Sequence, residues 1–239
     1  YALKLTQDLQ QAVLADFDKY EFHLAVQKFV GFCSEDLGGF YLDILKDRLY
    51  TSGENSHARR AAQSALHHIT HAMMRLMTPI LSFTADEIWQ TLGLDKDATV
   101  FEELWYQLPA HGLNAEQVQD WENLIQVRAL ANKAIEEKRG AGEVGSSLQA
   151  EITIAVDGPV YDSLIRMEDA LRFIFITSQA KAEKQSGSGL SFKVAASKHA
   201  KCDRCWHYRE DVGADAEHPH ICGRCVSNLF GAGEKRTYA

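Results

Sequence analysis

The chain has 239 residues, of which 46% are hydrophobic and 24% charged, and this composition excludes collagen-like and wholly disordered proteins. Acidic residues outnumber Lys and Arg by 33 to 25, and the net charge of −8 disfavours nonspecific coating of DNA or membranes. No apolar stretch reaches the about 20 residues of a membrane span, and residues 1–25 resemble no signal peptide, so no membrane partner is predicted. The odd number of cysteines without a secretory signal predicts a reducing compartment and a cytoplasmic location. Because the chain begins with Tyr1 rather than Met, we expect a processed start or a piece of a longer chain.

Residues 1–92 are predicted to be helical. Apolar side chains recur at the spacing of one helical face over residues 37–49 and again over residues 62–77. Gly53 breaks the first pattern, and Pro79 ends the second because proline lacks an amide donor and clashes with the preceding turn. Helices joined by such short breaks usually pack as an antiparallel bundle.

A capping signal predicts the start of the next helix. The hydroxyl of Thr84 is placed to accept a hydrogen bond from a free amide, and Glu87 is placed to reach back to the cap. Gly93 is placed to end this helix. Residues 94–114 contain Pro109 and are predicted to form a loop.

The hydrophobic period changes in the second half of the chain. Apolar positions between residues 118 and 140 predict a long helix, and alternation over residues 152–156 predicts a half-buried strand. A short helix over residues 164–171 and a second strand over residues 173–176 are predicted to follow. Residues 185–189 read Gln-Ser-Gly-Ser-Gly, which is typical of a flexible linker.

These patterns predict a mainly α protein with three parts. A helical bundle is expected over residues 1–112, followed by the long helix and a small α/β junction over residues 113–184. A cysteine-rich module is expected over residues 190–239. The candidate functional residues are therefore expected mainly in the last part of the chain.

Four of the five cysteines form a metal-binding pattern. Cys202, Cys205, Cys222 and Cys225 give the spacing Cys-x2-Cys-x16-Cys-x2-Cys, which is typical of a zinc site. Each pair is expected on one tight turn with both sulfurs facing one point, so that two turns form a tetrahedral cage. Four thiolates leave no open position, so we predict one structural zinc ion that supplies folding free energy to a module without its own core.

Other readings of these residues stay open. Disulfides or a redox Cys-x-x-Cys are less consistent with two pairs at this spacing. His207, His218 and His220 lie in the same loop and are minor alternative ligands. Cys33 is expected to be an inert core thiol, and the histidines between residues 67 and 71 are expected to be core or solvated side chains.

Positive charge and an aromatic ring accompany the cysteines. Between Lys193 and Arg209 the chain has five basic residues and one acid. Zn²⁺ with four thiolates carries −2, so part of this charge offsets the cage, and the excess is expected to face a polyanion together with Arg224, Lys235 and Arg236. Trp206 follows the second cysteine, and its ring is expected either to stack an unpaired base or to pack on the cage.

Several segments resemble class I aminoacyl-tRNA synthetases. Residues 81–89, Leu-Ser-Phe-Thr-Ala-Asp-Glu-Ile-Trp, resemble a stretch common to the anticodon-binding domains of the members for aliphatic amino acids. Residues 128–136 and 147–150 are similar to the helix and turn that follow in that group. The ending, Lys-Cys-Asp-Arg-Cys-Trp at residues 201–206 with Cys-Gly-Arg-Cys at residues 222–225, resembles the zinc module of the bacterial isoleucyl members. The valyl and leucyl members lack this ending.

This resemblance implies a function in tRNA recognition. It implies a bundle that docks tRNA near the anticodon stem, an α/β junction and a zinc knuckle at the anticodon. The whole enzyme would join isoleucine to tRNA(Ile) with ATP, and its catalytic and editing domains would lie upstream as partners of this region. The nucleotide motifs His-Ile-Gly-His and Lys-Met-Ser-Lys-Ser are absent, so we expect no catalytic residue here and a monomer that binds tRNA without activating an amino acid.

Individual tRNA contacts are inferred from the family resemblance and from the charge of the side chains. The positions matching the family imply that Arg204 and Trp206 touch anticodon bases. Lys201 and Arg224 are added as tRNA-binding residues from their charge alone.

Two other functions are compatible with the cysteine pattern. DNA glycosylases of the formamidopyrimidine type also end in this cysteine pattern, but they use an N-terminal Pro-Glu, and no proline lies near the start of this acidic chain. A zinc-ribbon protein-interaction module without nucleic acid is the second alternative. It predicts that Arg204 and Trp206 are irrelevant to tRNA affinity.

Overall fold

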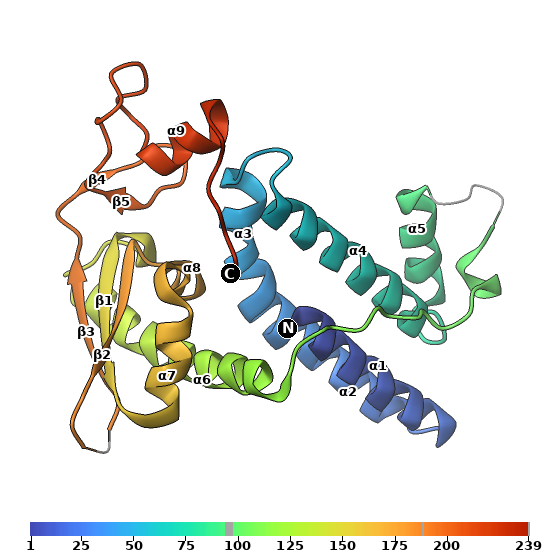
Figure 1. Ribbon diagram of the computed structural model, residues 1–239. Helices are drawn as coiled ribbons and strands as arrows, with labels where there is room; N and C mark the ends of the chain where they lie inside the picture. The colour runs from blue at the N-terminus through green and yellow to red at the C-terminus, as the bar shows by residue number, and fades with distance from the viewer. Residues whose placement is uncertain (94–97, 188, 239) are drawn as a thin grey trace. The chain divides into compact units, whose positions relative to one another are not determined.

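The computed structural model describes residues 1–93, 98–187 and 189–238 (Figure 1). These residues form two compact units, each described by itself. The first contains Tyr1–Asp43 and Ala61–Gly112, and the second contains Ile44–Arg60 and Leu113–Ala239. The break after Gly112 coincides with a predicted boundary, whereas residues 44–60 group with the C-terminal half. The three-part division of the chain stays a prediction.

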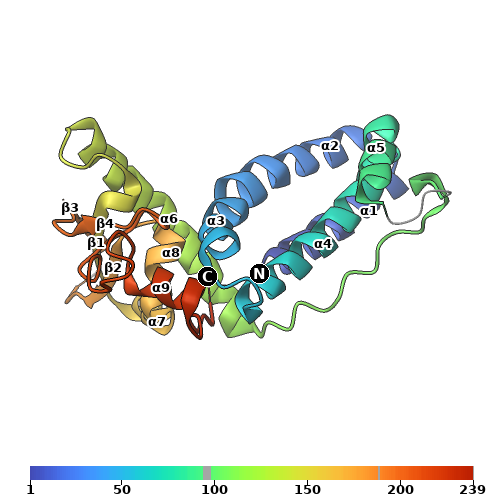
Figure 2. The ribbon, with the colours of Figure 1, turned by 90° about the horizontal axis from the view of Figure 1, so that it is seen from above.

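The first unit is helical, which confirms the prediction for this part of the chain. Its elements are α1 (Ala2–Asp18), α2 (Phe22–Gly31), the π-helix η1 (Phe32–Tyr41), most of α4 (His57–Met77) and α5 (Ser82–Leu92) (Figure 2). Buried apolar side chains from α1, α2, η1 and α4 form one core, which includes Leu9, Val13, Phe32, Leu37, Ile69 and Leu76. Burial of this shared apolar face holds the helices together.

The start of α5 differs from the prediction. The helix begins at Ser82 with Leu81 as its N-cap, and no side chain caps it, so the capping box expected at Thr84 and Glu87 is wrong. The turn after α4 leads directly into α5, because Leu81 N–H donates to the carbonyl of Met77 at 2.8 Å. Thr84 and Glu87 therefore lie inside the helix, while the predicted end at Gly93 is confirmed by its left-handed φ of 62°.

Between α5 and Ala115, where the next α-helix begins, the described residues contain one short helical turn and are otherwise irregular. Residues 94–97 of the predicted loop lie outside the described residues. Val100–Glu102 form the 3-10 helix η2, and Val100 is buried with Met74, Ala85 and Trp89 in a second small core.

The second unit is built on a three-stranded sheet with the order β2-β1-β3. The central strand β1 (Ala150–Val156) pairs in parallel with β2 (Gln179–Lys184) and antiparallel with β3 (Ser191–Ala196). Alternate residues of β1 are buried, which confirms the half-buried strand predicted from the sequence. Because only one face of β1 is buried, the helices of this unit need cover only that face.

Three helices pack against this sheet or against one another. They are α6 (Ala115–Gly140), α7 (Gly158–Arg166) and α8 (Leu171–Phe175) (Figure 1). Asn114 caps α6 through a capping box with Gln117, so the helix starts earlier than the apolar pattern indicated. Lys138 and Arg139 lie in its last turn, where the helix dipole favours positive charge.

The second predicted strand is wrong. Residues 173–176 were expected in a strand, but Leu171–Phe175 form the helix α8, and Ile176 ends it with a φ of 54°. A short run of buried apolar residues fits either structure, because its periodicity does not distinguish them. The second strand is β2 instead, and β3, which the prediction placed in the cysteine-rich module, completes the same sheet. Residue 188 of the expected linker lies outside the described residues.

The remaining elements of this unit are short. They are α3 (Leu42–Thr51, from Ile44 onward), η3 (Ser147–Gln149), η4 (Glu168–Ala170), β4 (Ala200–Lys201), β5 (Tyr208–Arg209) and α9 (Gly223–Phe230). None of the described helices combines the length and the apolar character needed to cross a bilayer.

Candidate metal centre and nucleic-acid interface

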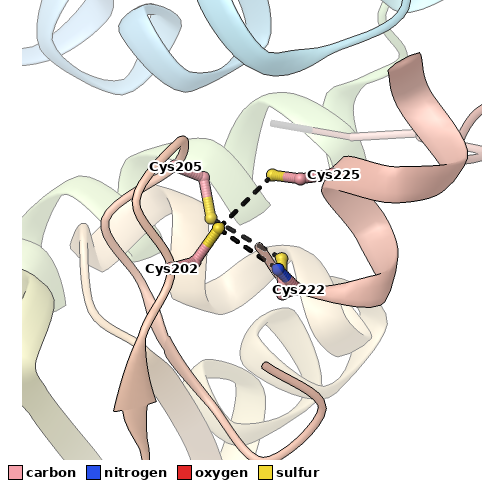
Figure 3. Close-up of side chains that lie close together, drawn as sticks. All are labelled: Cys202, Cys205, Cys222 and Cys225. Atoms are coloured by element: carbon pink, nitrogen blue, oxygen red, sulfur yellow. Dashed lines mark hydrogen bonds between the residues drawn. The ribbon is translucent and has the colours of Figure 1, made fainter. Parts of the chain in front are cut away.

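The four cysteines come together between a hairpin and a helix. The turn joining β4 and β5 carries Cys202 and Cys205. Cys222 is the N-cap of α9, and Cys225 lies in the first turn of that helix. In Figure 3 the four side chains converge on one point, as the spacing predicted.

Local backbone structure explains this convergence. Trp206 N–H donates to the carbonyl of Cys202 at 2.9 Å, and a left-handed φ of 65° at Trp206 turns the chain back into β5. In the second pair, Gly223 N–H donates to Asp211 Oδ2 at 2.9 Å, and a Cβ at this glycine would lie 2.9 Å from the same oxygen. A larger residue here would displace the Asp211 carboxylate from this hydrogen bond.

The distances between the sulfurs match a tetrahedral ion. Cys202 Sγ lies 3.8 Å from Cys225 Sγ, and Cys205 Sγ lies 3.8 Å from Cys222 Sγ. A tetrahedral Zn²⁺ with Zn–S bonds of about 2.3 Å places its sulfurs about 3.8 Å apart. All four side chains are buried, and four soft sulfur donors in this geometry favour zinc over hard cations such as Mg²⁺.

The surroundings of the sulfurs favour thiolates at Cys205 and Cys222, whereas the contacts with those two sulfurs raise the pKa of Cys225. Sulfur hydrogen bonds from Cys205 and Cys225 lower the pKa of Cys222 to about 3. The amide of Cys222 donates to Cys202 Sγ at 3.3 Å. Donors directed at sulfur stabilise the deprotonated form that binds a metal.

Two of the three histidines of the loop, His207 and His218, have other contacts, and His220 is exposed. The ring of His207 is buried, and its Nδ1 lies 3.2 Å from the carbonyl oxygen of Cys205. His218 stacks on Phe230 with ring centroids 4.0 Å apart. Within the part of the chain that the structure describes, the four cysteines alone form a group able to hold a metal ion. Cys33 is half-buried, and burial raises the pKa of its thiol, while its inertness stays a prediction.

A buried cluster of charges lies beside the metal centre. Asp47 of α3 accepts two hydrogen bonds from Arg224 at 2.8 Å each and one from Arg236 at 2.6 Å. Glu234 lies 3.3 Å from Arg224 and accepts a hydrogen bond from Asn228 of α9 at 3.0 Å. The cluster joins α3, α9 and the C-terminal tail within the second unit.

The pKa of Asp47 reflects this pairing. Burial alone would raise it, but the hydrogen bonds from Arg224 and the charges of Arg224 and Arg236 outweigh burial and lower the pKa well below its usual range. Asp47 is therefore a carboxylate that compensates two buried guanidinium groups. The ring of Phe173 in α8 closes the other side of the cluster, 3.6 Å from the guanidinium carbon of Arg236.

Of the four expected tRNA-binding residues, Lys201 and Trp206 contact each other, whereas Arg204 and Arg224 contact α3. Trp206 is 57% exposed, and the ammonium group of Lys201 lies 5.4 Å from the centre of its ring. Arg204 donates to the carbonyls of Thr51 and Tyr50 at the end of α3, and Arg224 is paired with Asp47. These tRNA contacts stay predictions.

The structure pairs Arg224 and Arg236 with acidic side chains, so their charge is not left unpaired as the sequence suggested, and a tRNA contact of Arg224 stays a prediction. Their side chains are only 12% and 3% exposed, because acidic side chains of the same unit bind them. Asp47, Glu234 and Asn228 were not singled out from the sequence. Asp47 lies 177 positions from Arg224, and no local pattern links residues so far apart.

Comparisons with known proteins identify the class of this chain. Residues 1–154 match the model of the anticodon-binding domain of tRNA ligase, and residues 201–228 match that of the zinc finger found in FPG and IleRS. The chain belongs to the family of tRNA ligase anticodon-binding domains. The zinc finger and the cysteine cluster together support a structural zinc ion. The match over residues 1–154 favours this family over a DNA glycosylase, which shares only the ending.

The similar curated proteins are isoleucine--tRNA ligases. The chain is 53% identical to that of Cupriavidus necator over 243 aligned residues, and 52% identical to those of Burkholderia cenocepacia and Dechloromonas aromatica. These alignments cover 99 to 100% of this chain and 25% of each relative. The chain thus spans a quarter of the length of these relatives, and the resemblance stated from its motifs is confirmed.

Proposed function

We propose that this chain is the tRNA-recognition region of an isoleucine--tRNA ligase and binds the anticodon region of tRNA(Ile). The observation that carries the proposal is the joint presence of an anticodon-binding region and a zinc finger with an exposed tryptophan. Cys202, Cys205, Cys222 and Cys225 are the proposed zinc ligands. The ion has a structural role, because four thiolates leave no position for a substrate.

Recognition is proposed to use base stacking and charge. Unpaired anticodon bases present faces that an exposed indole ring stacks upon, whereas bases in a paired stem do not. Lys201 and the free donors of Arg204 supply positive charge beside that ring, in a chain whose net charge is −8. Arg224 acts from within the module, where it holds α9 against Asp47.

The remaining steps of the reaction are assigned to other parts of the enzyme. We propose that ATP and isoleucine bind to the upstream catalytic domain, and that this domain and an editing domain are the partners of this region. The whole protein is proposed to be a cytoplasmic monomer.

Replacement of Trp206 by alanine is expected to weaken binding of tRNA(Ile) by about 1–3 kcal/mol, because one stacked base loses its aromatic partner. The dissociation constant of the zinc-loaded chain is measured by filter binding or fluorescence anisotropy. Trp206→Phe keeps a ring at this position and serves as the matched control. An unchanged dissociation constant for Trp206→Ala would favour the protein-interaction alternative.

The chain alone is expected to exchange no pyrophosphate into ATP in the presence of isoleucine. The reason is that it contains neither of the two nucleotide-binding motifs. The measurement is isotope exchange with a complete isoleucine--tRNA ligase as the positive control. Exchange that depends on isoleucine would show that catalytic residues lie within this chain.

A further inference from the structure

A second exposed aromatic residue, Tyr50, is linked through its backbone to the first cysteine turn. Tyr50 is 75% exposed, although Thr51 and Ser52, which follow it, are buried. The residue lies in the last turn of α3, in the same compact unit as Trp206. Figure 1 shows the end of α3 and the zinc-binding elements of this unit.

Arg204 connects Tyr50 to the turn that carries Trp206. Its guanidinium donates to the backbone carbonyl of Tyr50 at 3.3 Å and to that of Thr51. Arg204 lies two positions before Trp206, so one arginine side chain links the backbone of Tyr50 to the turn that carries Trp206. A guanidinium has five N–H donors, so donors remain for a phosphate or a base after these two contacts.

The position of Tyr50 is also fixed from α9. Asn228 donates to the carbonyl of Thr51 at 3.0 Å, and Asp47, one helical turn before Thr51, is paired with Arg224. Three side chains of the zinc module therefore hold the last turn of α3. A ring presented on such a supported backbone loses little conformational freedom when it binds a ligand.

We propose that Tyr50 is a second stacking residue and that it takes an unpaired base of the tRNA anticodon loop. The proposal rests on the proposed function and adds one residue to its binding surface. We call Tyr50, Lys201, Arg204 and Trp206 the aromatic-basic surface. Proteins that bind single-stranded RNA combine aromatic rings for stacking with basic groups for the backbone in this manner.

The chemistry of this surface selects unpaired RNA. A paired stem buries the faces of its bases and offers phosphates and 2′-hydroxyls, which an aromatic ring does not recognise. Exposed rings on segments that one arginine links instead suit unpaired bases, with a basic group available for the phosphate backbone. Asp203 is the exposed acid within the 201–206 turn, so the positive charges of Lys201 and Arg204 exceed the negative charge there.

The test compares ring removal with ring conservation in the complete zinc-loaded chain. Tyr50→Ala is expected to raise the dissociation constant for tRNA(Ile) about 5- to 150-fold, whereas Tyr50→Phe changes it less than about 2-fold. The dependence of log Kd on log salt keeps its slope in Tyr50→Ala, because no phosphate contact is lost, and it becomes shallower in Lys201→Ala. With 2-aminopurine placed in turn at each base of the anticodon loop, one position loses its stacking signal in Tyr50→Ala alone.

The controls distinguish the stacking role of Tyr50 from the proposed binding of tRNA(Ile) on which it rests. Phe230 is 62% exposed on α9 of the same unit, and Phe230→Ala is expected to leave the dissociation constant unchanged. Equal binding by the unmodified chain and Tyr50→Ala would overturn the role of Tyr50 while the proposed function stands. Equal losses in Tyr50→Ala and Phe230→Ala would overturn it as well. Failure of the unmodified chain to bind tRNA(Ile) would instead overturn the proposed function.

Discussion

Cys222→Ser is expected to release the zinc ion and unfold the zinc-binding elements. Few apolar side chains support these elements, since only Val212 and Ile221 pack against the cysteine cluster among the described residues. In peptides of this kind the binding of zinc contributes an apparent 10–16 kcal/mol, roughly, so metal binding and folding are one process. A hydroxyl is a poor replacement for a thiolate ligand, and the remaining three sulfurs do not complete the tetrahedron.

Elemental analysis and hydrogen exchange measure this effect. We expect one zinc per unmodified chain and close to none in Cys222→Ser, with loss of amide protection in β4, β5 and α9 but not in the sheet around β1. Cys33→Ser is the matched control, because Cys33 lies outside the cluster and its replacement keeps the metal. Full zinc content in Cys222→Ser would contradict the assignment of this ligand.

Asp47→Ala is expected to destabilise the second unit by about 3–5 kcal/mol, because it leaves the buried charges of Arg224 and Arg236 without their main partner. Urea unfolding monitored in this unit measures the loss. Asp203→Ala removes an exposed acid near the same module and is expected to change stability by less than about 0.5 kcal/mol. In a double-mutant cycle, Asp47→Ala and Arg224→Ala should be strongly non-additive, and simple additivity would contradict the pairing.

The same pairing predicts a pH dependence. The pKa of Asp47 is lower in the folded chain than its ordinary value of 3.8, so the folded state binds fewer protons at this group than the unfolded state. Its contribution is therefore complete above about pH 5 and declines as the pH falls through 3.8 toward the lower folded value. In Asp47→Ala the free energy of unfolding should decline less steeply as the pH falls below about 5. An unchanged decline would argue against a role for this carboxylate.

Local signals were sufficient for much of the fold and for the metal centre. The apolar spacing on η1 and α4 and the alternation on β1 each reflect which face of an element is buried, and this information lies within a few residues. The cysteine spacing is equally local, because each pair needs one turn. The prediction of a strand at residues 173–176 was wrong, because a short apolar run such as that of α8 can be buried as a strand or as a helix.

Long-range charge pairing could not be predicted from such patterns. Asp47 lies on an ordinary helical segment, and its partners lie at the other end of the chain. Positive charge near the cysteines therefore suggested exposure for Arg224 and Arg236, whereas their acidic partners come from α3 and the C-terminal tail. Tyr50 was overlooked for the same reason, since only the contact with Arg204 brings it to the cysteine turn.

The grouping of Ile44–Arg60 with Leu113–Ala239 has a practical consequence for dissecting the protein. A fragment cut after Gly112 retains all four zinc-binding cysteines and both arginines, yet it lacks the aspartate that neutralises them. Such a fragment would leave two arginines to share Glu234 without Asp47, and it would lose the carbonyls that anchor Arg204. A stable piece that contains the metal centre is therefore expected to need residues 44–60, either in the same polypeptide or supplied as a complementing peptide.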